Sequence, residues 1–166
     1  MGTSGRATAG TGAENRVADS VLAASRVLVS VAARSIAAAG QEITLPQYRA
    51  LVVIASRGPQ RPVGLAEALG ISSSTTTRLC DRLERKGLLL RERDYSATDR
   101  RAVLLRLAPA GTKLVADVTR RRRADIAAVL AEMAPRDRSR LVAGFEAFTR
   151  AAGEVPDAAW PTGSEL

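Results

Sequence analysis

The sequence predicts a mainly α-helical protein that contains one small β-hairpin. Over most of the 166 residues, apolar side chains recur three or four positions apart, which is the spacing of the buried stripe of an amphipathic helix. One stretch, residues 102–107, instead has a period of two, which is typical of a half-buried strand. Glycine and proline residues separate these segments and mark where helices end and begin.

The first predicted helix covers residues 13–40, and Gly40 ends it as a C-terminal glycine. Its apolar stripe consists of Val17, Val21, Ala24, Leu28, Ala32 and Ile36. Such small side chains let a second helix approach closely, and a helix of this length lacks an obvious partner in a short chain. We therefore expect it to pack between two subunits, with packing inside one subunit as the alternative. Residues 1–12 are rich in small residues without the apolar centre of a signal peptide, so we expect a disordered tail.

Three short helices are expected next. Pro46 begins the first of them, which ends before Gly58 and Pro59. The next covers residues 62–69. The last begins after Ser72, which we expect to act as its N-cap, and runs to about Lys86.

Two strands follow, at residues 88–93 and 102–107, joined by a long polar loop that we expect to be exposed and mobile. The tip of this loop carries Asp99, Arg100 and Arg101. Three helices followed by a β-hairpin form a winged helix-turn-helix, and we assign residues 45–107 to it. Such a unit places one helix in the major groove of DNA while the hairpin, or wing, reaches a neighbouring phosphate or minor groove.

Residues 109–152 are expected to form two further helices, divided near Pro135. Residues 153–166 are acidic and contain proline, so disorder is the expectation, with docking through Trp160 as the alternative.

The helix that follows Ser72 is expected to carry the DNA-reading face. At 100° per residue, Thr75, Thr76, Leu79 and Leu83 form its buried side. The opposite side presents the candidate DNA-binding residues Ser73, Ser74, Thr77, Arg78 and Arg85. Short hydroxyl side chains let the backbone approach a groove, and arginine reaches base edges or phosphates. The alternative is that these residues are caps and solvated filler, although consecutive threonines are poor helix formers.

The charge distribution supports a polyanionic partner. The net charge is +8, and residues 46–107 contain twelve basic and six acidic residues, so most of the excess lies in the predicted DNA-binding unit. Aromatic residues make up only 3% of the chain, which leaves little for stacking on single-stranded bases. Double-stranded DNA is therefore the expected partner. A winged-helix module for protein–protein interaction, without specific DNA binding, is the alternative function.

Several other classes are disfavoured. The chain has no histidine and shows no glycine-rich phosphate loop or nucleophile–base pair, so we expect neither an enzyme, nor a cofactor, nor a metal site. The one cysteine, Cys80, permits no internal disulfide and is expected to be a small core residue. We find no apolar run of about 18 residues and expect a cytoplasmic protein without a membrane span.

Three segments resemble the MarR family of winged-helix regulators: LPQYRALVVIA, LAEALGISSSTTTRLCDRLERKGLLLRE and TDRRAVLLRLAPAG, all within residues 45–114. The wing signature of that family, Asp-x-Arg before an alternating apolar strand, is matched by Asp99 and Arg101. One departure is Ala108, which stands where the family commonly has a threonine that caps the next helix.

The resemblance implies a homodimer, held by its first and last helices, that binds a pseudo-palindromic operator as a repressor. On this interpretation Arg101 enters the minor groove, Asp99 orients it, and Arg100 has a secondary role. Many members of the family also bind a small-molecule effector, but the sequence singles out no residues for one.

Overall fold

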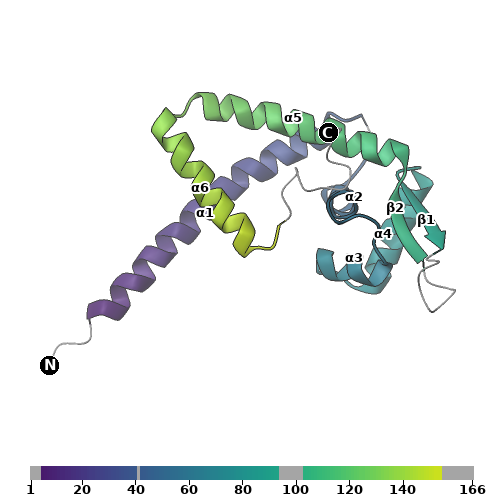
Figure 1. Ribbon diagram of the computed structural model, residues 1–166, viewed down its shortest axis with the longest axis horizontal. Helices are drawn as coiled ribbons and strands as arrows, with labels where there is room; N and C mark the ends of the chain where they lie inside the picture. The colour runs from purple at the N-terminus through teal and green to yellow at the C-terminus, as the bar shows by residue number, and fades with distance from the viewer. Residues whose placement is uncertain (1–4, 41, 94–102, 155–166) are drawn as a thin grey trace.

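The computed structural model describes residues 5–40, 42–93 and 103–154 (Figure 1). The elements in this part of the chain follow the order α1 (Gly5–Ala37), α2 (Leu45–Arg57), α3 (Pro62–Leu69), α4 (Ser73–Arg85), β1 (Leu89–Arg93), β2 (Val103–Leu107), α5 (Pro109–Ala131) and α6 (Pro135–Ala151). The predicted mainly α-helical fold with one β-hairpin is confirmed. A compact lobe contains α2, α3, α4 and the hairpin, while α1, α5 and α6 extend from it (Figure 1).

The core lies where α2 meets α4, the hairpin and the first half of α5. Fully buried leucines fill it, among them Leu51 of α2, Leu83 of α4 and Leu105 of β2, together with Leu65 of α3. The start of α5 closes this core through its buried residues Leu114, Val115 and Val118. Because β2 leads directly into α5 through Ala108, the position of the hairpin depends on how α5 begins.

The hairpin is a two-stranded antiparallel sheet in which Leu89 pairs with Leu107 and Arg91 with Leu105. The backbone of Gln60, in the turn before α3, adds two hydrogen bonds to Leu105: its N–H donates to the Leu105 carbonyl at 3.1 Å, and its carbonyl accepts at 2.8 Å. These bonds tie the middle of β2 to the turn between α2 and α3.

The helix ends follow the local sequence closely. Thr44 and Gln47 form a reciprocal capping box at the start of α2. The predicted N-cap of α4 is confirmed, because the Ser72 hydroxyl accepts from the Thr75 N–H at 3.3 Å. No side-chain cap is present at Ala108, before α5, and Pro109 at the first helical position removes one of the donors that such a cap would satisfy.

One expectation about the N-terminal region was wrong. Residues 5–12 belong to α1, although we assigned residues 1–12 to a disordered tail. No proline interrupts the chain before Pro46, and extending an existing helix is much cheaper than starting one. By length and composition alone, the segment Gly12–Ala37 of this helix is apolar enough to cross a membrane. That criterion is weak evidence, since core helices of soluble proteins also meet it.

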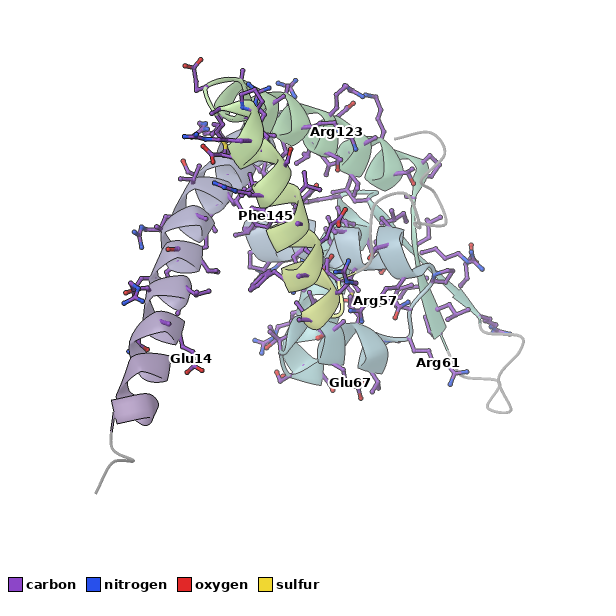
Figure 2. All side chains as sticks on the ribbon, turned by 60° about the vertical axis from the view of Figure 1, so that its left-hand side comes forward. Glu14, Arg57, Arg61, Glu67, Arg123 and Phe145 are labelled. Atoms are coloured by element: carbon purple, nitrogen blue, oxygen red, sulfur yellow. The ribbon has the colours of Figure 1, made fainter. Side chains whose placement is uncertain are left out.

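The N-terminal part of the predicted stripe of α1 is not covered by the rest of the chain, whereas Ala24 and Leu28 are half-buried. Its last members, Ala32 and Ile36, are buried, whereas Val17 is 64% exposed and Val21 38% exposed. The N-terminal half of α1, which carries Glu14, extends away from the other elements (Figure 2). The buried residues among the described side chains of α1 all lie in its C-terminal third: Val31, Ala32, Ser35 and Ile36.

Candidate nucleic-acid interface

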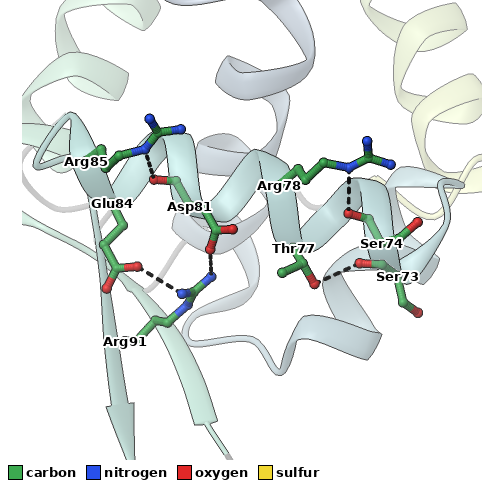
Figure 3. Close-up of polar contacts among 8 residues, drawn as sticks. All are labelled: Ser73, Ser74, Thr77, Arg78, Asp81, Glu84, Arg85 and Arg91. Atoms are coloured by element: carbon green, nitrogen blue, oxygen red, sulfur yellow. Dashed lines mark hydrogen bonds and ion pairs between the residues drawn. The ribbon is translucent and has the colours of Figure 1, made fainter.

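The candidate DNA-reading residues all lie exposed on α4. Thr76, Leu79, Cys80 and Leu83 are buried and fix which side of the helix faces the core. The opposite side carries Ser73, Ser74, Thr77, Arg78 and Arg85, all exposed, as the sequence predicts (Figure 3). Because the other side of α4 is buried, these five side chains lie on one accessible surface.

The two arginines of this surface project in the same direction. Arg78 and Arg85 are seven residues apart, close to two full helical turns. The Nε of Arg78 donates to the Ser74 carbonyl at 3.4 Å, and the Nε of Arg85 donates to the Asp81 carbonyl at 3.3 Å. Their terminal nitrogens point away from the helix (Figure 3). Each guanidinium is thus held against the helix by one nitrogen and presents the other two outward.

Hydroxyl groups cover the N-terminal turn of α4. The Thr77 hydroxyl donates to the Ser73 carbonyl at 2.9 Å. The Ser72 hydroxyl lies 3.1 Å from that of Ser74 and 2.9 Å from that of Thr75. This turn therefore presents short polar side chains around free helical N–H groups, an arrangement that suits close contact with an anion such as a phosphate.

One predicted member of the buried side of α4 was assigned wrongly. Thr75 is exposed, whereas Cys80, which we placed at the edge of that side, is buried. At 100° per residue the four buried residues centre about 50° from Leu79, on the side away from Thr75. Using Leu79 alone as the centre brought Thr75 into the buried set by mistake.

Arg91 of β1 joins the hairpin to α4, a role that we did not predict. Its guanidinium lies 2.6 Å from an Asp81 carboxylate oxygen and 3.0 Å from a Glu84 oxygen (Figure 3). The hydrogen bond that Arg91 donates to Asp81 is the main cause that raises the pKa of Arg91 above its usual value. A signal was present in the sequence, because Arg91 occupies the same face of β1 as buried Leu89, where a half-buried strand normally carries an apolar residue.

A second ion pair lies on the opposite face of the hairpin. Arg106 Nε is 2.6 Å from a Glu92 carboxylate oxygen, and both side chains are about half exposed. The candidate wing residues Asp99, Arg100 and Arg101 lie outside the described residues. The described residues include both strands that lead to the wing tip, β1 and β2.

Other site chemistry is limited in the described part of the chain. Burial raises the pKa of the Cys80 thiol to about 11, which keeps it protonated and unreactive near neutral pH. No group of three or more acidic or cysteine side chains capable of holding a metal ion occurs among the described residues. A small pocket between α2 and α3 is lined by Arg49, Val53, Arg57 and Glu154, among others.

The C-terminal helix presents a second type of surface. None of the residues of α6 is buried, and its apolar side chains Val142, Phe145 and Phe148 are 57%, 39% and 52% exposed. Figure 2 shows Phe145 near the middle of α6. Most of the exposed large apolar residues in the described part of the chain therefore lie on α1 and α6.

Comparisons with known proteins identify the family. The sequence model of the MarR family matches residues 43–103. The chain is 40% identical to RV1404 from Mycobacterium tuberculosis, whose crystal structure superimposes with a TM-score of 0.79 over 86% of this chain and 95% of that one. It is 27% identical over 110 residues to YfiV, an uncharacterized HTH-type transcriptional regulator of Bacillus subtilis, covering 66% of this chain and 68% of the relative.

A more distant likeness concerns the fold alone. FabT from Streptococcus pneumoniae, crystallised in complex with DNA, is 21% identical to this chain. The match has a TM-score of 0.65 and covers 84% of this chain and 97% of FabT.

Proposed function

This chain belongs to the MarR family of transcriptional regulators, and on that premise we propose that it is a cytoplasmic homodimeric repressor that binds a pseudo-palindromic DNA operator. Members of this family are regulators and not enzymes. One observation carries the proposal: the hydroxyl and arginine side chains of α4 form one exposed surface beside a hairpin that is fixed to the same helix.

Within this proposal, Ser73, Ser74 and Thr77 allow the N-terminal part of α4 to approach the floor of the major groove. Arg78 and Arg85 then reach base edges or phosphates with their outward nitrogens. The tip residues Arg100 and Arg101 reach the adjacent minor groove or backbone, with Asp99 orienting Arg101.

The uncovered helices support a homodimer. Exposed apolar residues lie along α1 and on α6, and α6 has no buried residue. A second copy of the chain carries the same apolar surfaces, so the two copies can cover each other across a twofold axis. Two copies of α4 related by that axis would read two half-sites about one helical turn of DNA apart.

Specific binding is tested by fluorescence anisotropy with a duplex selected from a random pool and a scrambled duplex of equal length. We expect the selected duplex to bind at least about a thousandfold more tightly. Arg78→Ala should weaken specific binding by about 1–3 kcal/mol. Arg136→Ala is the matched control: it removes the same charge from an 80% exposed side chain at the start of α6 and should leave affinity nearly unchanged.

Equal affinity for the selected and scrambled duplexes would defeat the proposal of an operator. Copurification of a stoichiometric protein partner, with no retention on DNA, would favour the interaction module instead. The family resemblance also implies a small-molecule effector that relieves repression. This part of the proposal is tested separately, by screening ligands for release of the bound selected duplex.

A further inference from the structure

Arg91 occupies an unusual place for a charged side chain. It pairs across the hairpin with Leu105, which is fully buried, and shares its face of β1 with Leu89, which is 1% exposed. Cross-strand partners in an antiparallel sheet lie on the same face. Arg91 therefore points from the inner face of the hairpin toward α4, and its side chain is only one-third exposed.

The helix supplies a matching pair of carboxylates. Asp81 and Glu84 are three residues apart and therefore neighbours on the surface of α4. Each forms an ion pair with a different terminal nitrogen of Arg91: Nη2 lies 2.6 Å from an Asp81 carboxylate oxygen and Nη1 lies 3.0 Å from a Glu84 carboxylate oxygen. Arginine can make both contacts at once because its guanidinium is a rigid planar fork, whereas the lysine ammonium is a single point charge.

The two carboxylates border the proposed DNA-reading surface. Thr77, Asp81 and Glu84 follow one another along one side of α4 at spacings of four and three residues. Negative charge there repels the DNA backbone unless a neighbouring cation neutralises it. Because Arg91 is engaged with both acids, its own charge is also poorly placed to bind a phosphate.

We propose that Arg91 is a positioning residue, which clasps β1 to α4 through Asp81 and Glu84 and thereby fixes the angle of the wing relative to the helix that reads DNA. This inference rests on the proposed function. Buried Leu89 holds β1 at the base of the hairpin, and the Gln60 backbone holds β2 at Leu105, which is the cross-strand partner of Arg91. The clasp gives β1 a second attachment, two residues nearer the tip than Leu89, and two attachments along a strand define its direction.

Neutralising the two acids separates this role from a phosphate contact. The double variant Asp81→Asn, Glu84→Gln removes two negative charges beside the DNA, which by electrostatics alone should tighten binding. If the acids hold Arg91, the same variant weakens binding to the selected duplex about five- to tenfold, a typical coupling between two sites. Its ratio of specific to scrambled affinity falls as well, at an unchanged midpoint of thermal unfolding.

The matched control is Glu92→Gln. Glu92 pairs with Arg106 on the outer face of the same hairpin, so this change also removes a negative charge and an ion pair but leaves the clasp intact. It should bind the selected duplex as tightly as wild type or slightly more tightly. Arg91→Lys should lie between wild type and Arg91→Ala, since lysine retains one of the two contacts. Tighter binding by the double variant would overturn the proposal.

A measurement without DNA judges the clasp independently. Amide hydrogen exchange in the free protein should speed up in residues 89–93 and 103–107 of the double variant, while α2 keeps its protection. Unchanged exchange in the hairpin would refute the clasp even if the protein binds an operator. If wild type selects no duplex but the variant loosens the hairpin, the proposed function fails and the clasp remains.

Discussion

Gly111→Ala should destabilise the protein, although alanine normally strengthens a helix. Gly111 is the third residue of α5, and a Cβ placed there would lie 2.1 Å from the carbonyl oxygen of Leu88 and 3.1 Å from its carbonyl carbon. Both atoms belong to the backbone just before β1, so no side chain can rotate away. The Leu88 carbonyl also accepts a hydrogen bond from the Ala108 N–H at 3.1 Å.

The expected size follows from three opposing terms. Overpacking a close contact costs about 1–3 kcal/mol. Loss of the Ala108 to Leu88 hydrogen bond adds about 0.5–1.5 kcal/mol. Replacing glycine by alanine within a helix returns about 0.5–1 kcal/mol. We therefore expect the free energy of unfolding to fall by about 1–3 kcal/mol.

Gly64→Ala is the matched control. Gly64 is likewise the third residue of a helix that begins with proline, but a Cβ there would meet only the side-chain oxygen of Gln60, at an ordinary 3.5 Å. This variant should be as stable as wild type or more stable by up to about 1 kcal/mol. Urea unfolding of both variants at the same protein concentration measures the difference. Equal stability of the two variants would show that the contact between Gly111 and Leu88 is not as close as the structure has it.

Three further predictions concern the cap, the dimer surface and the thiol. Ser72→Ala removes the N-cap of α4 and should lower the free energy of unfolding by about 0.5–2 kcal/mol in urea titrations, and an unchanged midpoint would contradict that role. The double variant Phe145→Ser, Phe148→Ser should sediment as a folded monomer at concentrations where wild type is a dimer, whereas persistence of the dimer would argue against the α6 surface. Burial raises the pKa of Cys80 to about 11 in the folded protein, against 9.0 for an ordinary cysteine thiol, so the folded state favours the protonated form. This contribution to stability is fully present below pH 9 and is lost, by up to roughly 3 kcal/mol, as pH rises through 11. Cys80→Ala should lack that alkaline loss in unfolding measured across this range.

The order and type of the elements could be predicted because each rests on local rules. The spacing of apolar residues, the cap at Ser72 and the glycines after α3 and α4 all act within a few residues of one another. The exposed candidate residues of α4 follow from the same periodicity. The family resemblance to residues within 45–114 agrees with the match of the family model to residues 43–103.

Contacts between elements could not be predicted from these local rules. The partners of Arg91 lie seven and ten residues earlier in the sequence, on another element, and only the register of the hairpin brings them together. The close approach of Gly111 to Leu88 depends in the same way on how α5 crosses the start of β1. The helix at residues 5–12 was missed for a different reason. We inferred disorder from the many small residues, but this segment continues into a long helix, and extending a helix is cheaper than starting one.

The ion pairs also change how the charge of the DNA-binding unit should be interpreted. Residues 46–107 contain twelve basic side chains, but Arg91 is engaged with two carboxylates and Arg106 with one. Each phosphate neutralised lowers the logarithm of the binding constant by about 0.9 per tenfold rise in salt. A count of basic residues therefore overestimates the salt dependence, and Arg78→Ala should reduce the measured slope whereas Arg106→Ala should not. A reduced slope for Arg106→Ala would mean that DNA breaks its pair with Glu92 and takes the guanidinium for itself.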